Sequence, residues 1–301
     1  MIIIRVMGGL GNQLQQFALY EKLRSLGRDA KLDLSWFHRD VQAKLAAPRE
    51  LELTRFPGLT IEACTHAERD RYLKRGPLAK AWSVVWGESP VFTESEMYHP
   101  EIFTFTDKYI EGYFACEKYY ADRLETLRTV LSFPLAVREV QRVRNMNLMN
   151  EMEERYSVSL HVRRGDYLDA ENAKLFGGIT TDAYYEKAMA LFIAREPRTH
   201  FYVFSDDLKY VREKYDNEDR FTIVEGNTGR DSLLDIELMS HCKGNICANS
   251  TFSFWGARLN PHPDKIMVRP LVMRNNQEAL PHKMHEYWEG WTLIDGRGEV
   301  V

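Results

Sequence analysis

The second half of the chain alternates strand-like and helix-like segments without interruption. Apolar runs of strand length are separated by segments whose apolar residues recur at helical spacing. In chain order these segments are 137–152 (helix), 157–162 (strand), 181–194 (helix), 200–204 (strand), 208–215 (helix), 221–225 (strand), 232–240 (helix), 244–248 (strand) and 253–259 (helix). Strict alternation predicts a parallel sheet with crossover helices. Ligands bind outside the carboxyl ends of such strands, so we expect the site there.

The chain also opens with a strand, a glycine turn and a helix. A β-branched run, 2–7, ends at Gly8, and apolar residues then recur at helical spacing up to Gly27. A second strand-like run, 30–34, follows the glycine. This order is a βαβ unit, which implies a second parallel sheet.

The border between the two patterns lies near Pro134. Segment 36–100 has weak periodicity, and we expect it to shape a substrate surface; 108–114 is typical of a strand and 117–131 of a helix. We therefore predict an α/β protein of two Rossmann-like, doubly wound domains that face a cleft, over 1–133 and 134–301.

Composition excludes several classes of protein. Of the 301 residues, 44% are hydrophobic and 28% charged, which is ordinary globular usage. A net charge of −4 gives no general reason to bind nucleic acid. The four cysteines lack the paired spacing of zinc sites and are too few for a disulfide scaffold.

No segment has the length and apolarity to span a membrane, and the start lacks the pattern of a secretory signal. Basic and aromatic residues mix in 74–86, but Gly76 and Pro77 favour an ordinary helix or loop there. We expect a cytoplasmic protein, at most peripheral at the inner face of a membrane.

The first candidate motif is the glycine loop 8–13, GGLGNQ, between the first strand and the first helix. Gly9 and Gly11 let a sugar or phosphate approach the backbone, and the amides of Asn12 and Gln13 suit sugar hydroxyls. Read as a dinucleotide fingerprint, the loop lacks its third glycine, although Asp33 lies about 20 residues further on, where such folds bind ribose.

The second motif, HVRRGDY over 161–167, follows the strand 157–162. Arg163 and Arg164 could bind a diphosphate through bidentate hydrogen bonds. One of them could instead pair with Asp166, and we expect Arg164 to be that one. His161 alone is more typical of a packed histidine than of a ligand.

The third set of candidates follows the next strands. Asp206 or Asp207 could accept hydrogen bonds from a guanine edge. Hydroxyls at a helix start, with the N–H groups of that helix, could hold phosphate. The residues of this segment are Asn249, Ser250, Thr251 and Ser253.

Taken together, GGLGNQ, HVRRGDY and NSTFSFWGARL (249–259) resemble the α-1,2-fucosyltransferases, and YIEGYFACEKYY (109–120) is similar to a further stretch of them. The motifs cover both halves of the chain in the family's order. The resemblance implies the two-domain GT-B architecture, with an acceptor-side first domain and a GDP-fucose-binding second domain. It also implies inverting transfer of L-fucose to the 2-hydroxyl of a terminal β-galactoside, on an oligosaccharide or glycolipid such as an O-antigen unit.

Kinship to other fucosyltransferases implies roles for single residues. Arg163 would hold the β-phosphate, and His161 with an aspartate of 204–207 would contact the guanosine. Thr251 and Ser253 would contact phosphates, and Asn12 would reach the reacting centre. The chain departs from the family at Phe254-Trp255, where two tryptophans are usual, and at Arg258, where a nonpolar or aromatic residue is usual.

The chemistry expected from these residues needs no metal. Charge grows on the leaving diphosphate, and arginines with helix N-termini can stabilise it. No Asp-x-Asp triplet is present; 235–237 comes nearest. Asp166 is the candidate base, although arginines beside a carboxylate make it a poor one.

Two alternative functions explain less of the sequence. A nucleotide-binding oxidoreductase built on the first βαβ unit explains only the first motif, and a non-catalytic carbohydrate-binding protein leaves the arginines unexplained.

We predict that GDP raises the melting temperature in the presence of EDTA, whereas NAD does not. A ligand that binds only the folded state stabilises it by about 2.7 kcal/mol at 100 times its Kd. Differential scanning fluorimetry with and without EDTA measures this. Loss of the GDP effect on chelation would contradict metal independence, and a shift with NAD would favour the oxidoreductase.

Overall fold

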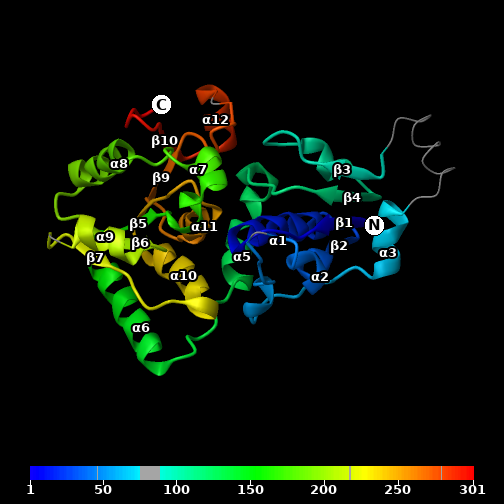
Figure 1. Ribbon diagram of the computed structural model, residues 1–301, viewed down its shortest axis with the longest axis horizontal. Coiled ribbons are helices and arrows are strands. Elements are labelled where there is room, and N and C mark those ends of the chain that lie inside the picture. Colours follow the sequence, from blue (N-terminus) through cyan, green and yellow to red (C-terminus); the bar gives the residue numbers. More distant parts are fainter. Residues whose placement is uncertain (46, 75–88, 217, 279) are drawn as a thin grey trace. The chain divides into compact units, whose positions relative to one another are not determined.

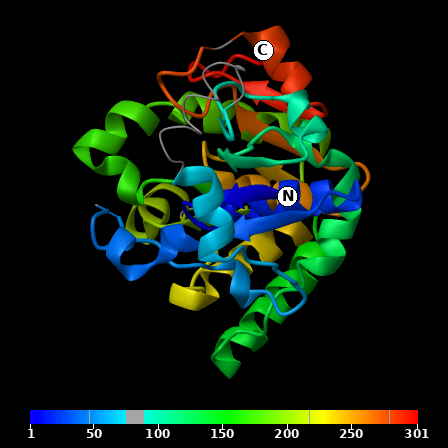
Figure 2. The ribbon, with the colours of Figure 1, turned by 90° about the vertical axis from the view of Figure 1, so that its right-hand side faces the viewer.

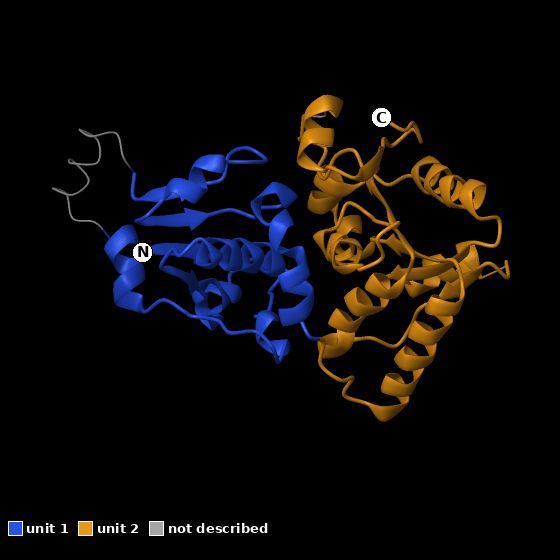
Figure 3. Ribbon diagram, turned by 180° about the vertical axis from the view of Figure 1, so that it is seen from behind, with its two compact units in different colours: residues 1–132 blue, residues 133–301 orange. Residues whose placement is uncertain are grey.

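The computed structural model describes residues 1–45, 47–74, 89–216, 218–278 and 280–301. The predicted helix or loop at 74–86 therefore lies, apart from Lys74, outside the described residues. The chain divides into two compact units, Met1–Ser132 and Phe133–Val301 (Figure 3), one residue before the predicted border. No helix among the described residues is long and apolar enough to cross a membrane.

Unit 1 contains a four-stranded sheet and flanking helices, which Figure 2 brings toward the viewer. Its elements are β1 (Ile2–Arg5), α1 (Leu10–Ser25), β2 (Ala30–Asp33), α2 (Arg39–Gln42), α3 (His66–Leu73), β3 (Val91–Thr93), β4 (Lys108–Glu111) and α5 (Leu124–Val130).

The sheet of unit 1 is parallel throughout, in the order β2-β1-β4-β3 (Figure 1). The chain moves from β1 to β2 on one side and later returns to β4 on the other. The strand order therefore reverses between β1 and β4, which is where an open α/β sheet binds ligands. Two loops meet there: the glycine loop after β1 and the segment after β4.

Unit 2 is built in the same way around six parallel strands. Its elements are α6 (Glu139–Glu154), β5 (Ser157–Val162), α7 (Ala170–Phe176), α8 (Asp182–Arg195), β6 (His200–Ser205), α9 (Leu208–Tyr215), β7 (Phe221–Ile223), α10 (Leu234–His241), β8 (Gly244–Ile246), α11 (Thr251–Leu259), β9 (Ile266–Pro270), α12 (Pro281–Tyr287) and β10 (Trp291–Ile294).

The strand order of unit 2 is β10-β9-β8-β5-β6-β7. β5 is buried along its whole length, because it pairs with β6 on one side and β8 on the other. One hydrophobic core packs β5 and β6 against α8, with Phe192 and Val203 among its fully buried side chains. The order reverses between β5 and β8, so the loops after these two strands form the edge at which a ligand is expected.

The prediction of one helix over 117–131 is wrong. Two short 3₁₀ turns, Glu117–Tyr119 and Ala121–Arg123, precede α5. Tyr119 and Tyr120 are both fully buried. The chain buries both neighbours by leaving helical geometry at Tyr120, whose φ is −151°.

The sequence interpretation also missed several elements. β9 and β10 extend the sheet of unit 2 beyond the four predicted strands, and β3 forms the edge of unit 1. β3 is only three residues long, and Arg269 within β9 breaks the apolar pattern that indicates a buried strand. Short strands are recognised by their partners in the sheet, which the local sequence does not specify.

We predict that Tyr109→Phe lowers the free energy of unfolding by about 1.5–3 kcal/mol. The Tyr109 hydroxyl donates to Oδ2 of the buried Asp33 carboxylate over 2.6 Å, and its loss would leave that oxygen without this donor. Urea denaturation measures the change. Tyr113→Phe is the matched control, because Tyr113 is 40% exposed and its stability should change by less than about 0.5 kcal/mol.

Candidate functional site

The loops after β5 and β8 carry the second and third predicted motifs to the switch point of unit 2. The Tyr167 hydroxyl donates to the Asn249 carbonyl over 2.9 Å, which joins the two loops directly. The Tyr185 hydroxyl donates to the His161 carbonyl, and the Tyr184 hydroxyl to the Cys247 carbonyl, so α8 holds both strand ends. The structure thus brings HVRRGDY and the segment 249–253 together.

Arg163 lies between two carboxylates. Its Nη2 contacts Asp166 Oδ1 at 2.5 Å, and its Nη1 contacts Asp206 Oδ2 at 2.9 Å. Burial lowers the pKa of the Arg163 guanidinium, but Asp206 and Asp166 outweigh it and the pKa lies above its ordinary value. A guanidinium has five N–H donors, so donors remain for a ligand.

Arg164 has a different set of partners. Its Nε donates to Asp207 Oδ2 over 3.1 Å, and its guanidinium lies 3.8 Å from the centre of the Tyr210 ring. The expectation that Arg164 pairs with Asp166 is therefore wrong. Arg163 faces Asp166 because the chain turns into a 3₁₀ helix, Gly165–Leu168, immediately after the arginines.

The guanine contact expected of Asp206 and Asp207 stays a prediction, and within the protein both carboxylates contact arginines. Asp206 holds Arg163 and also accepts the backbone N–H of Arg164 over 2.9 Å. Asp207 holds Arg164 and caps α9 by accepting the N–H of Tyr210. These bonds explain Gly165, since a Cβ there would lie 2.2 Å from Asp206 Oδ2.

His161 is buried, as expected of a packed histidine, yet its ring is incompletely bonded. Burial, followed by the charge of Arg163, lowers the pKa of His161 to about 3, so the imidazole is neutral at neutral pH. Its Nδ1 has no hydrogen-bond partner among the described residues. An unpaired nitrogen in such a place is costly unless a ligand or water completes it.

The segment 249–253 contains buried groups that support the loop and a half-buried threonine. The Asn249 amide nitrogen donates to the carbonyls of Phe176 and Met273, and the Ser253 hydroxyl donates to the Ser250 carbonyl, so Asn249 and Ser253 support the loop in this structure. Thr251 begins α11 and is half-buried. The first N–H groups of a helix have no acceptor within it, and they favour an anion.

In unit 1 the glycine loop takes the predicted position, but Gln13 has a structural role. The Gln13 side chain donates to the Gly8 and Glu50 carbonyls and accepts the N–H groups of Glu52 and Leu53. These four bonds leave it no capacity for an acceptor or phosphate.

Gly8, Gly9 and Asn12 keep the open character expected of the loop. Gly8 has φ +84°, which favours glycine, and a Cβ at Gly9 would meet nothing within 4 Å. Asn12 is half-buried, and its amide nitrogen would lie 2.6 Å from a Cβ at Gly8. Gly11 is buried as the second residue of α1, so it lies in the helix rather than in the exposed loop.

Asp33, the predicted ribose ligand of the oxidoreductase alternative, is buried. Its Oδ2 accepts from Tyr109 over 2.6 Å and its Oδ1 from the Ser35 N–H over 2.9 Å. Because Asp33 is only 3% exposed, its remaining lone pairs are out of reach of a ribose hydroxyl, so the structure does not favour this alternative.

The sequence interpretation gave little weight to two acids of α10. Burial raises the pKa of Asp235 to about 7, although a hydrogen bond from Asn227 acts in the opposite direction. Burial also raises the pKa of Glu237 to about 7. Perturbed acids are candidate functional groups.

Among the described residues no three His, Cys, Asp or Glu side chains form a group that could hold a metal ion.

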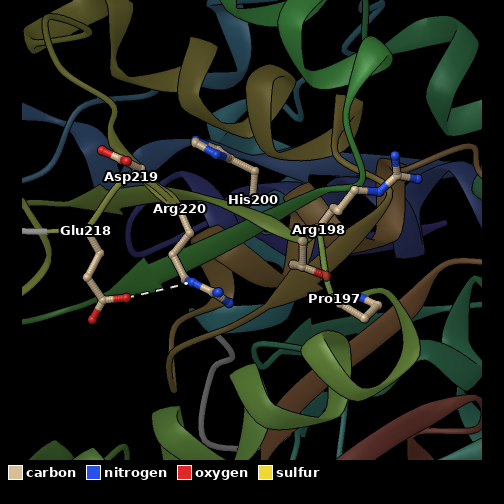
Figure 4. A pocket seen from close by; sticks show the side chains of 7 residues that line it. Pro197, Arg198, His200, Glu218, Asp219 and Arg220 are labelled. Carbon is tan, nitrogen blue, oxygen red and sulfur yellow. Dashed lines mark ion pairs between the residues drawn. The ribbon is translucent and has the colours of Figure 1, made fainter.

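A surface pocket of about 570 Å³ lies at the opposite edge of the same sheet (Figure 4). It includes His200, the first residue of β6, and Arg220, which precedes β7. Arg220 pairs with Glu218 at 3.7 Å, and Asp219 is a second acid in the lining. The pocket therefore lies at the amino ends of the strands, and its lining contains both arginines and acidic residues.

Comparison with known proteins identifies the family. The model of glycosyl transferase family 11 matches residues 100–295. The O-antigen biosynthesis glycosyltransferase WbnK of Escherichia coli is 31% identical over 290 residues, covering 87% of this chain and 91% of that protein. An α-1,2-colitosyltransferase of Escherichia coli is 28% identical over 299 residues, covering 92% of this chain and 93% of that protein.

Other likenesses are more distant. Galactoside α-(1,2)-fucosyltransferase 1 of Leontopithecus chrysomelas is 36% identical over 104 residues, which is 34% of this chain and 28% of that protein. The solved structure of the fucosyltransferase NodZ from Bradyrhizobium superposes with a TM-score of 0.45 at 16% identity, covering 89% of this chain and 94% of that one. The chain belongs to glycosyl transferase family 11.

Proposed function

We propose that this glycosyltransferase moves L-fucose from GDP-fucose to the 2-hydroxyl of a terminal β-galactoside, with inversion at the anomeric carbon. The curated relatives support a sugar of this kind, because their names describe α-1,2-fucosyl and α-1,2-colitosyl transfer. WbnK supports an O-antigen unit as acceptor.

One observation carries the proposal: Arg163 and the N-terminus of α11 lie on the loops that flank the switch point between β5 and β8. A guanidinium and a helix N-terminus at one sheet edge both favour a bound diphosphate. Among the described residues of unit 2, only the loops after β5 and β8 lie at the reversal in strand order and carry both the Arg163 guanidinium and the N-terminus of α11.

The proposed step breaks the bond between the sugar and the β-phosphate. Negative charge grows on the phosphate oxygen as the sugar becomes oxocarbenium-like, and the acceptor hydroxyl attacks from the opposite face. Arg163 is held by Asp166 and Asp206 before the donor arrives, so little reorganisation accompanies the step. This arrangement suits stabilisation of a leaving group.

The same geometry argues against Asp166 as a strong base. Its carboxylate contacts the Arg163 guanidinium at 2.5 Å, and its carbonyl accepts the Asn172 amide. The carboxylate oxygen that contacts Arg163 is occupied by this ion pair and is not placed to take the acceptor proton. We therefore assign Asp166 to the positioning of Arg163, and the acceptor hydroxyl gives its proton to water late, after the sugar has become strongly electrophilic.

We predict that Arg163→Lys lowers kcat by about 10²-fold or more while donor affinity falls much less. Lysine keeps the charge but loses the planar fork that contacts two carboxylates and phosphate. The measurement is kcat and KM with GDP-fucose, with circular dichroism to verify the fold. Arg164→Lys is the control and should lose less in kcat; near-normal turnover of Arg163→Lys would remove this arginine from the mechanism.

We predict transfer from GDP-fucose to a free β-galactoside, with the product linkage determined as α-1,2 by NMR. A colitosyl donor is the comparison, because one relative transfers colitose. Faster transfer of colitose than of fucose would change the donor assignment but keep the family. Absence of transfer from any GDP-sugar, with the fold intact, would contradict the proposed function.

A further inference from the structure

The segment after β4 forms the second loop at the switch point of unit 1, and the proposed function gives it no role so far. It runs from Gly112 to Phe114, directly beyond the end of β4 at Glu111. β4 pairs with β1 through Ile110 and Ile4, so this segment and the glycine loop leave neighbouring strands in the same direction. They therefore lie at one edge of the sheet.

The Gly112–Phe114 turn has a strained backbone. Among the described residues, Phe114 is the non-glycine residue with positive φ, at +50°. Such conformations cost free energy, persist only where the surroundings enforce them and cluster at functional sites. Phe114 is fully buried against Tyr119, so its side chain is an anchor rather than a ligand group.

Glu94 enforces this conformation from the neighbouring strand end. Its Oε2 accepts the N–H groups of Tyr113 over 2.7 Å and of Phe114 over 3.0 Å. A Cβ at Gly112 would lie 2.5 Å from the Glu94 Cβ, so only glycine fits against this side chain. The turn is thus fixed on both sides of Tyr113.

Gln16 of α1 fastens the turn to the glycine loop. Its Oε1 accepts the N–H of Met7, and its Nε2 donates to the carbonyl of Gly112, each over 2.9 Å. The side chain is fully buried. One amide therefore sets the spacing between the open surface at Gly9 and the backbone that carries Tyr113.

Tyr113 is the exposed residue of this rigid turn. It is 40% exposed, whereas Tyr109, Tyr119 and Tyr120 in the same stretch are buried. Only its backbone N–H has a hydrogen bond recorded among the described residues. A strained turn, a half-buried carboxylate and a buried amide thus hold an exposed aromatic ring in one position, which is unusual for a ring that does not pack in the core.

We propose that Tyr113 binds the acceptor, with its ring against the apolar C–H face of the terminal β-galactoside. This inference rests on the proposed function, which supplies the class of acceptor. A pyranose presents one face of C–H groups and a rim of hydroxyls. An aromatic ring suits that face, and the open backbone at Gly9 with the Asn12 amide suits the rim. Glu94 acts as a positioning residue through the backbone of Tyr113.

The test compares Tyr113→Ala with Tyr113→Phe, using GDP-fucose and a β-galactoside such as lactose. Removing the ring should raise the acceptor KM about tenfold or more, with the donor KM changed less than about twofold. Phenylalanine keeps the stacking face and should restore the acceptor KM to within about twofold of the wild-type value. Glu94→Gln, which weakens the hold on the turn, should raise the acceptor KM by a smaller factor.

The outcomes separate the two proposals. An unchanged acceptor KM in Tyr113→Ala, with the wild type active on lactose, would overturn the role of Tyr113 alone. Equal rises in donor and acceptor KM would also overturn it, because a general distortion of unit 1 would then explain the effect. A wild-type protein that binds GDP but transfers to no β-galactoside would overturn the class of acceptor, and with it this inference.

Discussion

The pairing of β5 with both β6 and β8 is the constraint on which the candidate site depends. β5 is buried along its length and has a parallel neighbour on each side, so three loops leave one sheet edge within hydrogen-bonding reach of one another. Tyr167 then joins the loop after β5 to the loop after β8, and Asp206 joins it to the loop after β6. A shift of one residue in either register would turn the side chains to the opposite face and separate these groups.

In unit 1, too, loops meet where the strand order of the sheet reverses, but they carry different side chains. Its strand order also reverses beside the first strand, and two loops meet at that reversal. The loops of unit 2 carry charged groups, whereas those of unit 1 present glycine backbone, amides and an exposed tyrosine. Charged groups suit a diphosphate, and uncharged polar and aromatic groups suit a sugar, which supports the proposed placement of the donor in unit 2 and of the acceptor in unit 1.

The charged side chains on the loops after β5 and β6 do not form a simple basic pocket. Arg163 and Arg164 face Asp166, Asp206 and Asp207, so acidic groups outnumber basic ones. Net charge alone would not attract a diphosphate here. In the proposed donor site the attraction comes from directed groups, namely the remaining guanidinium donors and the first N–H groups of α11, and the carboxylates hold the arginines in position. Neutral His161 adds a ring nitrogen without adding charge.

The sequence by itself determined the α/β class, the opening βαβ unit, the border near Pro134 and the motifs that indicate the family, because each is a local pattern or a spacing along the chain. It did not determine the partners of the polar groups within those motifs. Gln13 was expected to bind a ligand but bonds to backbone 37 to 40 residues away, and Asp206 contacts Arg163, a partner that the sequence did not indicate. Only the tertiary structure decided such roles, since a side chain's partner is set by which strands lie side by side, and strand order depends on packing of the whole sheet rather than on the neighbouring residues.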